Sequence, residues 1–104
     1  MKTQKNYTTK DDLVVLHTKE NEYIVKHGQI MEIAIDVMEL VLKFGKIYLK
    51  AKGEFIPNAV SIANIITENY LKNTSRIEKI NLDSEFLENG SKLLSTIEII
   101  LLKS

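Results

Sequence analysis

The chain has 104 residues, which is enough for one domain with a single hydrophobic core. Its 14 basic and 14 acidic residues give a formal net charge of zero, and the absence of cysteine excludes disulfides and thiolate chemistry and gives no reason to expect secretion. No apolar run approaches the roughly 20 residues of a membrane span, and the N-terminus lacks an apolar signal core. We therefore expect an intracellular protein without a membrane anchor, located in the cytoplasm or in the nucleus or nucleoid.

The sequence contains no recognisable catalytic or metal-binding motif. His17 and His27 are its only histidines, and no His-x-x-x-His pair, nucleophile elbow or carboxylate pair with acid–base spacing occurs. Gly53 stands without the second glycine and the Lys-Ser/Thr ending of a Walker loop. We expect a protein that is not an enzyme and that needs no cofactor or metal.

Residues 1–20 form a polar N-terminal extension with one apolar run, Leu13-Val-Val-Leu16. One interpretation is a flexible tail whose lysines follow a phosphate backbone, although Asp11 and Asp12 interrupt them. The other interpretation is a short strand over residues 13–17 that pairs with the domain. The domain itself is expected over residues 21–104.

Two strand-to-helix units open the domain. The first has a strand from Tyr23 to His27 and a helix from Gln29 to Phe44, in which apolar residues recur at three- and four-residue steps. Gly45 follows, where a left-handed C-cap is expected. Lys26 and His27 therefore lie immediately before a helix.

The second unit begins with Ile47 to Lys52, in which apolar residues alternate with polar ones, among them Lys50. This period of two predicts a strand with one buried face and one basic, solvated face. Gly53 and Pro57 predict a turn and a helix start, and the helix continues to about residue 71. The strand therefore delivers a glycine hinge to a helix N-terminus, which favours anions such as phosphate.

A hairpin ends the chain. Arg76 to Phe86 and the run from Lys92 onward have the patterns of strands, and Asn89-Gly90 between them is a strong turn signal. The last strand is largely apolar on both faces, so we expect its second face to be covered by another chain or by the N-terminal run.

These elements follow the order βαβαββ. Strands joined through a helix are expected to be parallel with a right-handed crossover, and the last two strands to be antiparallel. Two helices are enough to cover one face of a four-stranded mixed sheet. The predicted fold class is therefore α/β, of the α+β kind, in a two-layer sandwich.

The run Lys50-Ala-Lys-Gly53, followed by Ile56, Ala59 and Val60, resembles the Lys-Ala-Arg-Gly-x-x-Ile-x-x-Ala-Val signature of the Alba family of small nucleic-acid-binding proteins. Ser95-Thr-Ile-Glu-Ile-Ile100 is similar to the family's final strand, and the likeness extends from about residue 21 to the C-terminus. The family includes archaeal chromatin proteins, eukaryotic RNA-binding members and protein subunits of RNase P and RNase MRP. The resemblance implies an Alba-like fold, a homodimer or a heterodimer with a related chain, and a last hairpin that lies as an arm along the DNA minor groove.

The resemblance also implies where nucleic acid is contacted. In the family, basic residues in the loop after the first strand contact phosphates, and Lys26 and His27 match that loop. Tyr70 falls at an aromatic position that contributes to contact between dimers. Together with lysines that the predicted fold brings to one side, the expected nucleic-acid-binding residues are Lys26, His27, Lys46, Lys50, Lys52, Gly53, Lys79 and Lys92.

Several residues depart from the family's pattern. Glu54 stands where arginine commonly follows the glycine, Lys52 replaces another arginine, and Glu85 and Glu88 lie near the tip of the arm. These changes favour RNA or partner-assisted binding over strong DNA packaging, and a single arginine, Arg76, predicts little sequence specificity. Three questions stay open: DNA or RNA as the ligand, a role in an RNase P- or MRP-like ribonucleoprotein, and a protein-interaction module that has lost nucleic-acid binding.

Overall fold

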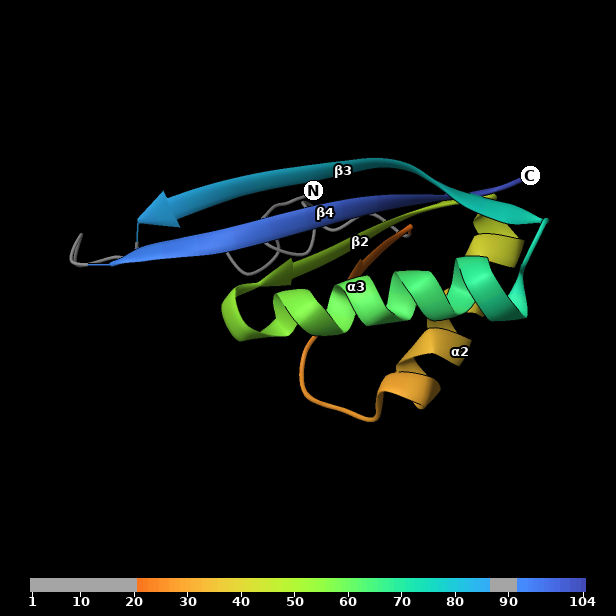
Figure 1. The fold of residues 1–104 in the computed structure, drawn as a ribbon, viewed down its shortest axis with the longest axis horizontal. Coiled ribbons are helices and arrows are strands. Elements are labelled where there is room, and N and C mark those ends of the chain that lie inside the picture. The colour runs from red at the N-terminus through yellow and green to blue at the C-terminus, as the bar shows by residue number, and fades with distance from the viewer. Residues whose placement is uncertain (1–20, 87–91) are drawn as a thin grey trace, which may run out of the picture.

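Strands and helices alternate in the order that the sequence predicts (Figure 1). The computed structural model describes residues 21–86 and 92–104. Its elements are β1 (Glu22–Ile24), α2 (Ile30–Phe44), β2 (Lys46–Lys52), η1 (Gly53–Phe55), α3 (Ile56–Ile65), η2 (Ile66–Tyr70), β3 (Ser75–Phe86) and β4 (Leu93–Lys103).

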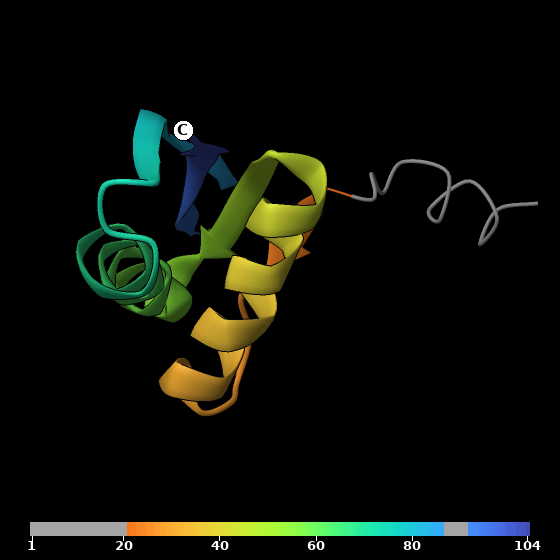
Figure 2. The ribbon, with the colours of Figure 1, turned by 90° about the vertical axis from the view of Figure 1, so that its right-hand side faces the viewer.

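The four strands form one sheet in the order β1-β2-β4-β3. β1 runs parallel to β2, and β4 runs antiparallel to both β2 and β3. Both α2 and α3 lie on the same face of the sheet, as the end view in Figure 2 shows. The opposite face, which we call the open face, carries no helix among the described residues. The predicted two-layer α+β sandwich with a mixed sheet is therefore confirmed.

The core lies between the helices and the sheet, and α2, α3, β2 and β4 each contribute one apolar stripe to it. The stripes have the three- and four-residue spacing of a helix in α2 and α3 and the period of two of a strand in β2 and β4. Each large aliphatic side chain buried in this way stabilises the fold by about 1.5–3 kcal/mol. The buried members are Val25, Ile33, Ala34, Val37, Val41, Ile47, Leu49, Ala51, Ala59, Ile62, Ala63, Ile66, Ile97, Ile99 and Leu101.

The helix ends follow the signals in the sequence. Gly45 ends α2 with φ of 79°, a left-handed conformation that glycine adopts without a Cβ clash, and its N–H donates to the Val41 carbonyl at 2.8 Å. Pro57 is the second residue of α3, where its missing N–H leaves no helical hydrogen bond unmade. The helix after it continues through the wider turn of η2 to Tyr70, close to the predicted end.

β1 is shorter than the predicted strand from Tyr23 to His27. It ends at Ile24, and the N–H of Val25 makes one further hydrogen bond, to the Lys50 carbonyl at 2.8 Å. The chain then leaves the edge of the sheet to enter α2 below it. Lys26 and His27 are exposed and belong to this loop rather than to a strand.

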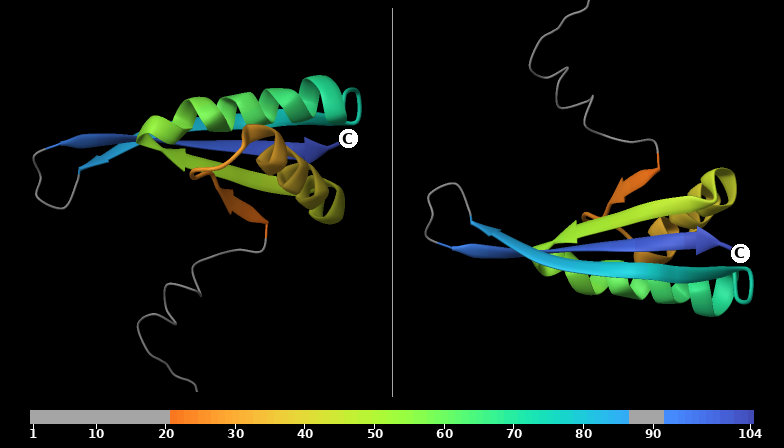
Figure 3. Two further views of the ribbon diagram at one scale, coloured as in Figure 1. Left: turned by 90° about the horizontal axis from the view of Figure 1, so that it is seen from below. Right: turned by 90° about the horizontal axis from the view of Figure 1, so that it is seen from above.

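The ends of β3 and β4 project beyond α3 (Figure 3). We call residues 82–86 of β3 and the paired residues 93–97 of β4 the arm, of which residues 93–95 lie beyond the pairing of β4 with β2. The predicted Asn89-Gly90 turn lies outside the described residues, as does the extension over residues 1–20 with its alternative strand at 13–17. Both stay predictions.

Candidate nucleic-acid interface

Two loops meet at the end of the sheet from which the arm projects. The ring of His27, in the loop between β1 and α2, contacts the ring of Phe55, in the turn between β2 and α3. Their centroids lie 4.8 Å apart and their planes are nearly perpendicular, at 89°. This contact brings Lys26 and Gly53 into neighbouring loops, as the sequence predicts for a phosphate-binding site. Glu54 is exposed in the same turn as Phe55, so this end also carries a carboxylate.

Gly53 is constrained in two ways. Its φ of 54° lies in the left-handed region, and a Cβ added there would lie 3.1 Å from Cδ1 of Leu94 on β4. The turn therefore passes close to the start of the arm, and a larger residue would strain the backbone and push against Leu94.

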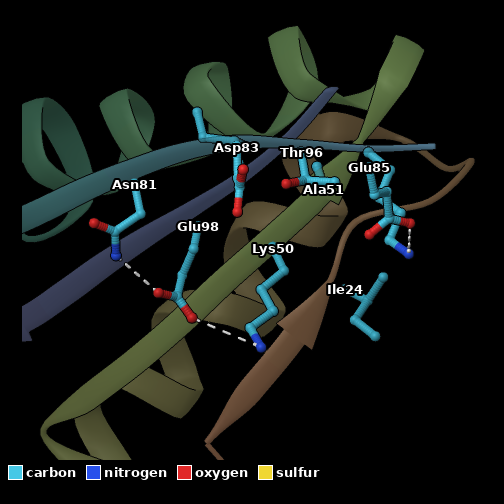
Figure 4. A pocket seen from close by; sticks show the side chains of 10 residues that line it. Ile24, Lys50, Ala51, Asn81, Asp83, Glu85, Thr96 and Glu98 are labelled. Carbon is cyan, nitrogen blue, oxygen red and sulfur yellow. Dashed lines mark hydrogen bonds and ion pairs between the residues drawn. The ribbon is translucent and has the colours of Figure 1, made fainter. Parts of the chain in front are cut away.

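The lysines of β2 point to the open face, but carboxylates from other strands hold them (Figure 4). Nζ of Lys50 lies 2.9 Å from the carboxylate of Glu22 on β1 and 3.7 Å from that of Glu98 on β4. The hydrogen bond with Glu22 is the main reason that the pKa of Lys50 is raised, with partial burial acting in the opposite direction. Lys50 therefore stays charged but is already partnered.

Lys52 and Lys46 have acidic partners as well. Nζ of Lys52 lies 3.0 Å from Glu85 on the arm, and Nζ of Lys46 lies 3.6 Å from Glu78 on β3. A hydrogen bond with Tyr48, followed by the charge of Glu78, raises the pKa of Lys46. Since these pairs are exposed, solvent screening leaves each of them little effect on the stability of the fold.

Local sequence could not reveal these ion pairs. The run from Lys43 to Lys52 contains lysines and no acid, which predicts a positive strand. The partners of Lys50 and Lys52 lie 28 and 33 residues away in the sequence, and only the strand register brings them together. The available signal was the presence of Glu22, Glu85 and Glu98 in the other three strands, and using it requires the strand register.

A groove of about 330 Å³ lies on the open face between β1 and the arm (Figure 4). Its charged lining combines Lys50 and Lys52 with three carboxylates, of Asp83, Glu85 and Glu98. Asn81 donates to Glu98 at 2.9 Å and fixes that carboxylate beside Lys50. An anion would meet more negative than positive charge in this groove.

The remaining predicted site residues lie apart from one another. Lys79 is exposed in β3, opposite Ile100 near the end of β4. Lys92 is exposed just before β4, at the arm. Tyr70 is exposed at the end of η2, on the helical layer. The structure thus brings together the two loops, whereas the predicted lysines are spread over the loop after β1, strand β2, strand β3 and the start of β4.

Other kinds of site find no support in the part of the chain that the structure describes. Within residues 21–86 and 92–104, no three or more acidic or histidine side chains gather as a metal site would require. Nor is any helix there long and apolar enough to cross a membrane.

Comparison with known proteins agrees with the fold and with the motif. The family model described as Alba matches residues 21–84. Two curated relatives named DNA/RNA-binding protein Alba, from Thermoplasma volcanium and Thermoplasma acidophilum, are each 38% identical to this chain over 71 residues, which cover 62% of this chain and 79% of theirs.

Solved structures give the same result. Alba from Thermoplasma volcanium superposes with a TM-score of 0.71 at 32% identity, over 80% of this chain and 100% of that one. ALBA1 from Trypanosoma brucei, at 19% identity, shares the fold with a TM-score of 0.69 over 84% of this chain and 72% of that one. With the family signature at the turn between β2 and α3 and the matching arrangement of strands and helices, this chain belongs to the Alba family.

Proposed function

We propose that this chain is a non-enzymatic nucleic-acid-binding protein that contacts the phosphate backbone with little sequence specificity. The observation that carries the proposal is its similarity to relatives named DNA/RNA-binding protein over most of their length. The single arginine agrees with weak base readout, because bidentate contacts to base edges rely mainly on arginine.

The two apposed loops are the proposed primary contact. Lys26 has no ion pair with an acidic group of the described residues, and the backbone turn at Gly53 leads through η1 into α3, whose N-terminus favours anions. Lys50 and Lys52 are already paired with Glu22 and Glu85, so a phosphate must replace one of these carboxylates to bind either lysine. The exposed Lys52–Glu85 pair is weak, so that exchange is feasible at Lys52, whereas the Lys50–Glu22 pair is partly buried and should exchange less readily. At both lysines the exchange lowers the gain from a phosphate contact.

The experiment is a fluorescence anisotropy titration against labelled duplex DNA and against a structured RNA. We expect salt-sensitive binding of at least one of them, and the tighter ligand identifies a DNA or an RNA role. Lys26→Ala should weaken binding, whereas Lys43→Ala, which removes an exposed lysine from the last turn of α2, should leave it nearly unchanged. Equal effects of the two substitutions would refute the loop assignment, and no binding to either ligand would refute the function and favour a protein-interaction module.

We also propose that the working form is a dimer, either of two copies or with a related chain. Four large apolar side chains of β3 and β4, Ile80, Leu82, Phe86 and Leu93, are 50–73% exposed. By strand register they continue the buried face of the sheet beyond the helices, since Ile80 pairs with Ile99 and Leu82 with Ile97. Apolar surface of this kind, running on from the core, is typical of a protein interface.

A further inference from the structure

At the end of the open face where β4 ends and β2 and β3 begin, the strand register places the side chains in two rows. Lys46 on β2 and Arg76 on β3 both pair with Leu102 on β4, so these three side chains form one row. Tyr48 and Lys79 both pair with Ile100 and form the next row. Paired residues point to the same face of a sheet, so all six side chains lie on the open face. The right-hand view of Figure 3 looks onto this face.

The charges on this end differ from those near the arm. Arg76 and Lys79 are exposed, and among the described residues neither forms an ion pair with an acidic side chain. Lys46 forms an ion pair with Glu78, in which Nζ lies 3.6 Å from the carboxylate. Glu22 on β1 pairs with Tyr48 and also lies in the second row, but its carboxylate is held by Lys50. Three cations therefore face two acids, one of which already has a cation of its own. Toward the arm the balance is reversed, because Lys50 and Lys52 are surrounded by Glu22, Asp83, Glu85 and Glu98.

The centre of this end is apolar and aromatic. Ile100 is 7% exposed although it points away from the helices, and Leu102 and Tyr48 beside it are half-buried. Nζ of Lys46 lies 5.3 Å from the centre of the Tyr48 ring. A platform with one aromatic ring and with cations on β2 and β3 results. We call it the basic half-face: Lys46, Tyr48, Arg76, Lys79, Ile100 and Leu102.

We propose that the basic half-face binds single-stranded nucleic acid, with phosphates on Arg76, Lys79 and Lys46 and a base packed on the Tyr48 side of the platform. This inference rests on the proposed function and adds to it a second contact surface, distinct from the two loops. Unpaired bases stack on aromatic side chains of flat sheets, whereas a flat face cannot enter a duplex groove. The carboxylates toward the arm repel phosphates, which confines the strand to this end.

The test is a titration of a labelled single-stranded RNA at several salt concentrations, with thermal unfolding recorded for every variant. Arg76→Gln combined with Lys79→Gln should reduce the steepness of the plot of log affinity against log salt by about 1.4, because each lost contact to a single-stranded phosphate removes about 0.7. Lys43→Gln combined with Lys72→Gln removes the same charge away from the open face and should leave the slope unchanged.

Tyr48 provides an independent readout. Tyr48→Leu should weaken binding about fivefold or more, because stacking of one base on an aromatic ring is lost, whereas Tyr48→Phe should retain most of the affinity. Unlabelled duplex DNA should displace the single strand poorly from the Lys26→Ala variant, in which the loop contact is weakened.

The outcomes separate this inference from the proposed function. Wild-type protein that binds no nucleic acid would refute both. Wild-type binding with equal slopes for the two double variants would refute the half-face and leave the function intact. Efficient displacement by duplex, or equal losses in Tyr48→Leu and Tyr48→Phe, would also overturn the single-strand assignment.

Discussion

Lys50 shows how one side chain couples the strands of the sheet. It joins β1, β2 and β4 through Glu22 and Glu98, and the Glu22 side chain is only 11% exposed. The hydrogen bond with Glu22 raises the pKa of Lys50 above the ordinary lysine value of 10.5. A group whose pKa is raised by folding contributes stability that is complete below its unfolded pKa and is lost as pH rises through the folded value.

We therefore predict that the free energy of unfolding falls more steeply above pH 10.5 in wild-type protein than in Lys50→Met. Urea denaturation at a series of alkaline pH values measures this difference. Lys72→Met is the control, because it removes an exposed lysine that has no ion pair among the described residues. Parallel pH profiles for wild type and Lys50→Met would show that the Glu22 contact does not persist in solution.

Gly45 and Gly53, whose φ angles of 79° and 54° are left-handed, differ in their surroundings. An added Cβ at Gly45 meets nothing within 4 Å, so Gly45→Ala should cost only the backbone strain, about 1 kcal/mol of unfolding free energy. Gly53→Ala should cost more, because the new methyl group also presses on Leu94. Chemical denaturation of both variants measures the difference, and an equal or smaller loss at Gly53 would contradict the close approach of the turn to β4.

The packing of the helices on the sheet depends on their buried apolar stripes. Replacing isoleucine by alanine inside and outside a stripe tests this dependence. Ile62 in α3 is fully buried and Ile35 in α2 is 41% exposed. Ile62→Ala should lower the free energy of unfolding by about 2–5 kcal/mol through lost burial and a cavity. Ile35→Ala should lower it by less than about 1 kcal/mol. Similar losses measured by urea denaturation would mean that the helix is rotated relative to the sheet.

The helices and strands could be predicted from the sequence where the residues that determine them lie close together in the chain. The stripes of α2 and α3, the Gly45 cap and the alternation in β2 are set by neighbours within a few residues, and the structure agrees with them. The end of β1 and the bulge between Ile77 and Lys79 depend on strand pairing, which a single-sequence pattern does not encode.

The same distinction explains the candidate site. The loops that carry Lys26 and Gly53 meet through His27 and Phe55, since each loop directly precedes a helix of a strand-to-helix unit, and their role in binding stays a prediction. The acidic partners of Lys50 and Lys52 were not predicted, because they come from strands distant in sequence. The lysines considered alone overstate the positive charge of the open face.

On the scale of the whole molecule, the arm provides the test of assembly. Leu82 and Leu42 are both exposed leucines, at 72% on the arm and 44% on α2. If the arm lies in the dimer interface, Leu82→Lys should shift the protein toward monomer in light scattering after size-exclusion chromatography, and Leu42→Lys should not. A dimer that survives Leu82→Lys would place the interface elsewhere.

The whole chain has no net charge, so its affinity for nucleic acid must come from how charge is distributed. Among the described residues, Lys26 at the two-loop end and Arg76 and Lys79 on the basic half-face have no ion pair with an acidic side chain, whereas Lys50 and Lys52 between them are held in ion pairs. This arrangement predicts moderate affinity that depends on a few phosphate contacts and therefore on salt.

The most direct test of the proposed function is the slope of log affinity against log salt concentration for the wild-type protein. We predict a straight line of negative slope, about −0.7 per contacted phosphate on single strands and about −0.9 on duplex DNA, with similar slopes for unrelated sequences. A flat line, or no measurable binding at about 50 mM salt, would contradict phosphate binding and show that the fold serves a protein partner instead.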